Sequence, residues 1–176
     1  MWYVIQVRAG QEEKIVFQCR KKIQNYIEGT EKAGMLERCF IPYYEQKRRY
    51  EGAWHTEQRV LFPGYVFLIS NDVEGLFFEL KKVQGLTKLI GTGKEIVPLS
   101  ESEVQLLLHL GGDDQIVETS IGVMEQDQIC ITRGPLMGLE GCIKKIDRHK
   151  RTAWLEIEMM GRIVETRVGL EVVEKR

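Results

Sequence analysis

Apolar residues recur at about every second position from Val123 to Arg176, and no helical spacing overlies them. Such alternation is typical of strands that bury one face. Turn-forming residues interrupt it at Gly134-Pro135, Gly138, Gly141, Asp147 to Lys150, Gly161 and Gly169. Several short strands with frequent turns predict a small closed barrel, because closure removes edges that so small a unit cannot otherwise protect.

The chain before Gly111 mixes strand and helix patterns. Strands are predicted over residues 1–8, 39–44 and 60–69, and helices over 11–27, 73–83 and 100–110. Ser100 and Glu103 have the spacing of a capping box. Residues 45–59 have little hydrophobic periodicity and predict a hairpin tip around Gly52. The mixture predicts an α+β fold with an antiparallel component.

A change of composition predicts the domain boundaries. Residues 111–122 contain Asp113, Asp114 and Glu118 but no Lys or Arg, which is typical of a solvated linker. We therefore expect a domain over 1–110, an acidic flexible linker over 111–122, and the barrel domain over 123–176.

The charge balance and the cysteines exclude several classes. The 25 basic residues against 26 acidic ones give a net charge of −1, so any basic patch must be local. The four cysteines form no CxxC pair and favour free thiols in a cytoplasmic protein. No apolar run approaches the roughly 18 residues that cross a bilayer, and no secretory signal opens the chain.

Catalytic and metal-binding motifs are missing from the sequence. The 3 histidines, His55, His109 and His149, occur singly and far apart. Glu156 and Glu158 alternate on an expected strand, which usually means one exposed face. We therefore predict a protein that is not an enzyme, with no catalytic residues, no metal and no cofactor.

A local basic group is the first positive signal. It is interleaved with aromatic residues and includes Lys14, Arg20, Lys21, Lys22, Lys47, Arg48, Arg49, Arg59, Tyr43, Tyr44, Tyr50 and Trp54. Cations contact phosphates, and exposed aromatics stack on bases. A solvated hairpin, neutralised by Glu45, Glu51 and Glu57, explains the same residues. Both interpretations stay open.

The apolar run from Leu61 to Phe67 is the second signal. A buried central strand explains half of its side chains. Because neighbouring residues point to opposite faces, the other half must be covered by a helix or by a partner.

Three motifs, in this order, resemble the NusG family of transcription elongation factors. They are Trp2-Tyr3-Val4, the box Phe62-Pro63-Gly64-Tyr65-Val66, and the pattern of Ile131, Gly134-Pro135, Gly138 and Gly141, which looks like a KOW motif. The resemblance implies an N-terminal NGN domain, with an antiparallel sheet and flanking helices. It also implies a C-terminal, SH3-like KOW β-barrel of five strands.

The resemblance further implies partners. NGN domains dock on the clamp helices of RNA polymerase, and the matching residues here are Phe62, Tyr65 and Phe67. Specialised members such as RfaH contact nucleic acid, nascent RNA or non-template DNA, through positions that correspond to Arg8, Lys14 and Lys21. Together with the local basic group, the expected nucleic-acid set is Arg8, Lys14, Lys21, Lys47, Arg48, Arg49, Arg59 and Trp54. The barrel is expected to bind a ribosomal protein or a termination factor, and the chain to be a monomer.

Two basic segments, 47–55 and 144–157, are similar to LoaP-type specialised paralogs, which act as antiterminators at particular operons. The chain departs from RfaH at Leu76-Phe77-Phe78, where RfaH has a His-Thr-Thr bridge to polymerase. The alternatives are a housekeeping NusG elongation and termination factor and a KOW-containing, translation-associated RNA-binding protein.

Overall fold

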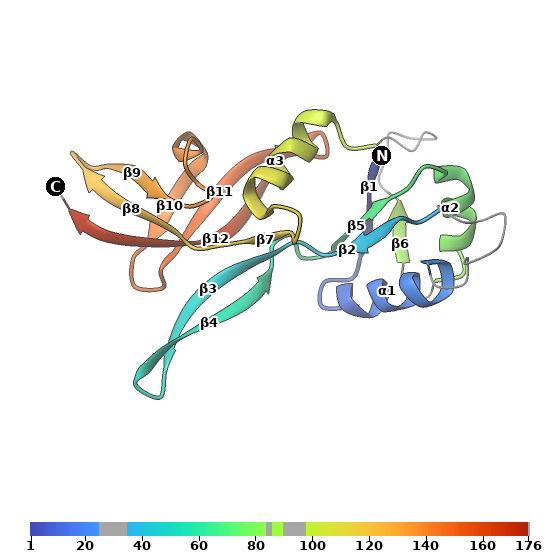
Figure 1. Cartoon of the computed structure of the whole chain (residues 1–176), viewed down its shortest axis with the longest axis horizontal. Helices are drawn as coiled ribbons and strands as arrows, with labels where there is room; N and C mark the ends of the chain where they lie inside the picture. The colour runs from blue at the N-terminus through green and yellow to red at the C-terminus, as the bar shows by residue number, and fades with distance from the viewer. Residues whose placement is uncertain (25–34, 84–85, 90–97, 176) are drawn as a thin grey trace. The chain divides into compact units, whose positions relative to one another are not determined.

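The computed structural model describes residues 1–24, 35–83, 86–89 and 98–175, and its contacts divide the chain into two compact units (Figure 1). The first unit comprises Met1–Ile41 and Phe62–Val104, and the second comprises Pro42–Leu61 and Gln105–Arg176. Residues 42–61 thus interrupt the first unit in sequence but fold with the second.

The first unit is built on a four-stranded sheet in the order β2-β5-β1-β6, with all neighbours antiparallel. Its elements are β1 (Trp2–Val7), α1 (Glu12–Cys19), η1 (Arg20–Gln24), β2 (Arg38–Phe40), β5 (Tyr65–Ile69), α2 (Val73–Leu80) and β6 (Leu86–Leu89). The predicted helical stripe is confirmed at Ile15, Cys19 and Ile23, which are buried. Its fourth member, Ile27, lies outside the described residues.

The central strand β5 is covered on both faces by the chain itself. Val66, Phe67 and Leu68 are consecutive and are all 0% exposed. The Phe67 ring stacks on Phe40 at a centroid distance of 5.7 Å and lies 5.8 Å from Phe62. Since successive side chains point to opposite faces, no external partner is needed to bury either face of β5.

A buried carboxylate fixes the turn that leads into β5. Glu12, only 3% exposed, accepts the Gly64 N–H at 2.8 Å through Oε1 and the Gly10 N–H at 2.9 Å through Oε2. Gly64 has φ +87°, a conformation that favours glycine. The Val7 N–H donates to its carbonyl at 2.8 Å, so this turn is tied to the end of β1.

The second unit contains a five-stranded sheet in the order β10-β11-β12-β8-β9. Its elements are β8 (Ser120–Glu125), β9 (Gln128–Arg133), η2 (Glu140–Cys142), β10 (Ile143–Asp147), β11 (Thr152–Met159) and β12 (Arg162–Lys175). β12 pairs with β8 in parallel, and the other pairs are antiparallel. The prediction of strands after Val123 is confirmed, but the turn predicted at Gly169 is wrong, since β12 has 14 residues and runs through it. Closure into a barrel stays a prediction.

A hairpin forms the other sheet of the second unit. Strands β3 (Tyr43–Tyr50) and β4 (Ala53–Val60) pair with each other, and β7 (Ile116–Val117) adds in parallel to β3. Glu51 (φ 51°) and Gly52 (φ 75°) form its two-residue turn, so the predicted tip is confirmed.

The single strand predicted over 39–44 is wrong. Pro42 has no N–H for a ladder, and β2 and β3 enter different sheets on either side of it.

Helix α3 (Glu101–Gly111) begins with the predicted capping box. The Glu103 N–H donates to Ser100 Oγ at 3.2 Å, and the Ser100 N–H donates to Glu103 Oε1 at 3.0 Å.

The segment predicted as a linker, 111–122, contains β7 and the first residues of β8. No helix among the described residues is long and apolar enough to cross a membrane.

The hairpin approaches strand β12 closely at Gly169. A Cβ at this position would lie 2.5 Å from the Glu45 carbonyl oxygen and 2.7 Å from Thr119 Oγ1. Thr166 Oγ1 donates to the Leu61 carbonyl, and Lys47 forms an ion pair with Glu171 at 3.2 Å. The hairpin is therefore attached to β12 along its length, and only glycine fits at the closest point.

Replacing Gly169 with alanine tests this attachment. Because the added methyl group meets a backbone oxygen, we expect Gly169→Ala to lower the free energy of unfolding by about 1–3 kcal/mol. Urea denaturation measures the loss. Gly141→Ala is the matched control, since a Cβ at Gly141 meets no atom within 4 Å. Equal stability of the two variants would contradict the close approach.

The contrast between Phe67 and Tyr65 tests the burial of β5. Phe67→Ala leaves a cavity in the core and should cost about 3–5 kcal/mol of stability. Tyr65 is half-buried, so Tyr65→Ala should cost clearly less. Thermal and urea unfolding of both variants measure the difference, and a Phe67→Ala protein as stable as the wild type would show that β5 is not a core strand.

Candidate nucleic-acid interface

A pocket of about 380 Å³ lies on the second unit, and its charge is strongly one-sided. Six Lys or Arg side chains line it, and no Asp or Glu does. The lining residues are Tyr44, Gln46, Lys47, Arg48, Arg49, Trp54, Arg59, His149, Lys150 and Arg167. A concave surface lined by one sign of charge attracts ligands of the opposite sign.

The hairpin supplies most of the pocket, and its register explains how. Tyr44 pairs with Arg59 across the two strands, and Arg49 pairs with Trp54. Directly opposite side chains on paired strands lie on the same face, about 4.5–5.5 Å apart at Cβ. The pairing therefore brings cations beside aromatic rings that are five or more positions away in sequence.

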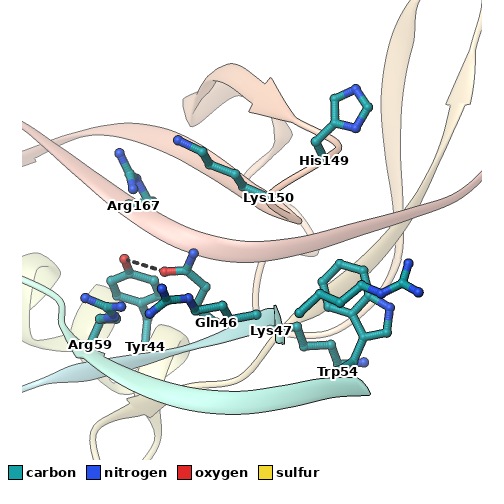
Figure 2. A pocket seen from close by; sticks show the side chains of 10 residues that line it. Tyr44, Gln46, Lys47, Trp54, Arg59, His149, Lys150 and Arg167 are labelled. Carbon is teal, nitrogen blue, oxygen red and sulfur yellow. Dashed lines mark hydrogen bonds between the residues drawn. The ribbon is translucent and has the colours of Figure 1, made fainter. Parts of the chain in front are cut away.

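The C-terminal sheet supplies the other side of the pocket. Figure 2 shows Lys150 and Arg167 on one side and Tyr44 and Arg59 on the other. The Lys150 N–H donates to Asp147 Oδ1 at 3.0 Å, which closes the turn after β10. This backbone hydrogen bond is the main cause that lowers the pKa of Asp147, so the carboxylate that holds the turn stays charged.

Tyr44 lies where the two sides converge. It is 6% exposed, and burial raises the pKa of its hydroxyl, while the charges of Arg167 and Arg59 act in the opposite direction. Both guanidinium groups therefore lie near the phenol, which stays protonated at neutral pH. Its hydrogen bond to Gln46 Oε1 is long, 3.5 Å, and Figure 2 draws it as a dashed line.

Two carboxylates partly balance the cations. Glu57 pairs with Arg59 at 3.1 Å and with Arg48 at 3.9 Å. Glu171 pairs with Lys47 at 3.2 Å and with Arg151 at 3.6 Å. Each carboxylate faces two cations, so positive charge remains in excess.

The rest of the pocket has no acidic partner. In the part of the chain that the structure describes, no carboxylate pairs with Arg49, Lys150 or Arg167. Of the three glutamates that would neutralise the hairpin, Glu57 does pair with its cations. Glu45 and Glu51 form no ion pair within the described residues. A fully neutralised hairpin is therefore not what the geometry describes.

Exposed aromatic rings flank the cations. Trp54 is 41% exposed, and the Arg151 guanidinium lies 3.7 Å from its ring centroid. Tyr50 is 44% exposed and stacks on His55 at 3.7 Å. An exposed ring that a guanidinium or another ring holds in place by stacking is suited to stacking on bases.

The structure gathers only part of the predicted nucleic-acid set. Lys47, Arg48, Arg49, Arg59 and Trp54 line one pocket. The remaining members are exposed on the first unit and are not among its lining residues; they are Arg8, Lys14 and Lys21. Their role stays a prediction.

Sequence patterns missed the contribution of the C-terminal sheet. His149 and Lys150 belong to the basic segment 144–157, which is similar to LoaP-type paralogs but supplied no member of the expected nucleic-acid set. Arg167 had no signal, because alternating charges on a strand are typical of an exposed face.

The three predicted polymerase contacts differ in exposure. Phe62 is 2% exposed and Phe67 is 0% exposed, and both belong to the core of the first unit. Tyr65, at the start of β5, is half-buried. Of these three side chains, only Tyr65 is therefore accessible enough to contact a partner.

The cysteines are free, as expected from their spacing. Cys19 and Cys39 are buried and hydrogen-bonded to each other, and this bond together with burial raises the pKa of Cys39. Within the described ranges, no group of three or more His, Cys, Asp or Glu side chains is placed to hold a metal ion.

Comparisons with known proteins agree along the whole chain. Transcription termination/antitermination protein NusG of Halalkalibacterium halodurans is 26% identical over 98% of this chain and 96% of its own length. The protein of the same name from Campylobacter jejuni is 23% identical over 99% of this chain and 96% of its own length. A solved structure described as "Domain interaction in Thermotoga maritima NusG" has a TM-score of 0.60 and 27% identity, covering 97% of this chain and 93% of that one.

The family described as "Transcription termination factor nusG" matches residues 1–108, which include the first unit's β1, β2 and β5 and the cationic hairpin. The match covers more than half of the chain, and this chain therefore belongs to the NusG family.

Proposed function

We propose that this chain is a processive antitermination factor that acts at particular operons. It binds RNA polymerase through the first unit and nucleic acid through the cationic pocket, and it thereby suppresses pausing or termination. It acts by binding and not by catalysis. The observation that supports this proposal most is the pocket itself, with its Lys and Arg lining and no acidic residue.

Phosphate is the chemistry that such a pocket recognises. A polyanion that binds Lys and Arg releases its condensed counterions, so affinity comes largely from charge and falls with salt. Sequence or shape preference then comes from Trp54 and Tyr50, because phosphate contacts carry no sequence information. The ligand is nascent RNA or the non-template DNA strand, the two single strands that an elongating polymerase exposes.

Polymerase docking is assigned to the start of β5. Tyr65 offers a half-buried aromatic surface, and Phe62 and Phe67 support it from the core. Glu12 holds the preceding turn through the Gly64 N–H, so the tyrosine sits on a rigid backbone. Rigid, partly buried aromatics are frequent anchors of protein interfaces.

The C-terminal sheet is assigned to a KOW-type barrel that stays in its β form. Its strands alternate buried and exposed residues, as in β11, where Leu155 and Ile157 are buried and Glu156 and Glu158 are exposed. A helical form would need a different periodicity. This barrel would contact a ribosomal protein or a termination factor.

A housekeeping elongation and termination role is the second candidate. The full-length similarity to proteins named for both termination and antitermination favours it. Transcription of unrelated terminators in vitro separates the two candidates. An operon-restricted factor changes readthrough only on its own leader, whereas a housekeeping factor acts on all templates.

Removing the hairpin cations tests nucleic-acid binding. We expect the triple variant Lys47→Ala, Arg48→Ala, Arg49→Ala to bind leader RNA and DNA more weakly. The slope of log affinity against log salt concentration should flatten by up to about 2, since each single-strand phosphate contact contributes about 0.7. Fluorescence anisotropy across salt concentrations measures both.

The control for this triple variant removes the same charge elsewhere. Arg133, Lys144 and Lys145 are exposed on β9 and β10 and do not line the pocket, so their alanine variant should retain affinity and slope. If both variants behave like the wild type, the hairpin is only a solvated face.

Truncating Tyr65 tests polymerase docking. Tyr65→Ala should weaken binding to core polymerase by about 2 kcal/mol or more, because it removes an interfacial anchor. A pull-down and a binding titration measure the loss, and circular dichroism confirms that the variant is folded. Phe17→Ala, which removes a 65% exposed ring from α1, is the matched control. Unchanged affinity of a folded Tyr65→Ala protein would refute the assignment.

A further inference from the structure

We propose that one phosphate group of the bound nucleic acid is held jointly by Arg59 of the hairpin and by Arg167 and Lys150 of the C-terminal sheet. Strand β12 and the turn after β10 are then part of the nucleic-acid site. This inference rests on the proposed nucleic-acid function of the pocket, and it adds two residues, Lys150 and Arg167, that lie outside the segment matched by the family.

Convergence of like charges is the first argument. Arg167 of β12 and Arg59 of β4 line the same pocket as Tyr44, and the charges of both act on its hydroxyl. Glu57 pairs with Arg59, but no carboxylate among the described residues pairs with Arg167, so repulsion between the two cations is only partly balanced. A phosphate between them turns this repulsion into two charge-assisted contacts.

Unused hydrogen-bond donors are the second argument. The Arg167 Nε atom is buried and has no partner, while its guanidinium lies 4.3 Å from the Trp154 ring centroid. Stacking on this ring fixes the plane of the guanidinium but satisfies none of its N–H groups. Among the described residues, the Tyr44 hydroxyl has only its long bond to Gln46, and the Lys150 ammonium forms no ion pair, although its charge acts on the nearby Asp147 carboxylate.

Burial gives these donors their importance. A buried polar atom without a partner costs free energy. Because the Arg167 Nε atom itself is covered, a phosphate in the pocket would contact the Nη groups of the same guanidinium. Phosphate matches the planar fork of arginine in a bidentate way, and it accepts a further bond from a neutral hydroxyl. Arg167, Arg59, Lys150 and Tyr44, which line the same pocket, thus offer a phosphate both charged and neutral donors.

The extent of the pocket favours a strand of nucleic acid over an isolated phosphate ion. Arg59 lies opposite Tyr44, and Arg48 lies four positions further along β3 on the same face, about 14 Å away at strand spacing. That distance is close to the axial rise of about four nucleotides. A polyanion can therefore engage the subsite and the hairpin tip together.

Neutralising the sheet side tests the subsite in the full-length chain. We expect the double variant Lys150→Gln, Arg167→Gln to bind short single-stranded RNA and DNA about tenfold more weakly at low salt. The slope of log affinity against log salt concentration should flatten by about 0.7, which corresponds to the loss of one phosphate contact. Arg133→Gln with Lys145→Gln removes the same charge from exposed positions outside the pocket and should leave both values unchanged.

A single variant separates binding from folding. Arg167 packs on Trp154, so its loss can disturb the sheet, whereas Lys150 is exposed and only its backbone N–H is bonded, to Asp147. Lys150→Gln alone should therefore keep the melting temperature and lose part of the affinity. If Lys150→Gln and the double variant both bind like the control, the sheet holds no phosphate.

The hairpin triple variant distinguishes the two possible failures. Loss of affinity in the triple variant but not in the sheet variants overturns the subsite alone and leaves the hairpin function standing. Wild-type affinity in all variants overturns both. Inorganic phosphate, tested at matched ionic strength, should displace the oligonucleotide better than chloride from the wild type but not from the double variant, and equal displacement from the wild type would overturn the subsite. Displacement by phosphate at the concentration of the oligonucleotide itself would show a site for free phosphate and would overturn the assignment to a nucleic-acid strand.

Discussion

The close approach of β3 to β12 at Gly169 is the contact on which the candidate interface depends. A two-stranded hairpin is marginally stable by itself in water, and one that carries several cations is less stable still. Attachment to a longer strand supplies what the hairpin lacks. The backbone of β3 reaches the Gly169 Cα, Thr166 reaches the Leu61 carbonyl, and Lys47 reaches Glu171. Without these contacts, the two sides of the pocket would not face each other.

The electrostatics follow from this attachment. Glu57 and Glu171 are each placed between two cations, so they restrain the side chains without cancelling the charge of the pocket. Such exposed pairs contribute little to stability, with a median of about 0–1 kcal/mol. Their main effect is geometric, because they order long side chains before a ligand binds. Less side-chain entropy is then lost on binding.

Local patterns predicted most of the secondary structure and part of the interface. The alternation after Val123 predicted strands β8–β12, and Ser100 with Glu103 predicted the start of α3. These features depend on residues that are close in sequence. The break at Pro42 was missed because a continuous run of β-favouring residues hides a change of sheet.

The remaining features depend on long-range pairing. Alternation alone does not reveal that β5 is buried on both faces, which requires knowing what packs above and below it. Likewise, Lys150 and Arg167 are more than 80 positions from the hairpin, and only the docking of β3 on β12 brings them to Tyr44. A basic run indicates that cations are exposed, but not which of them converge.

The hairpin is encoded inside the first unit and folds with the second, and this arrangement constrains how the gene can change. An exchange of C-terminal segments between relatives would keep the hairpin cations of residues 47–49 but replace the surface on which they rest. Position 169 must remain glycine while the hairpin keeps this path, because any side chain at 169 meets the backbone at 45. The N-terminal segment that encodes the hairpin and the C-terminal segment that encodes β12 must therefore remain compatible at this one contact.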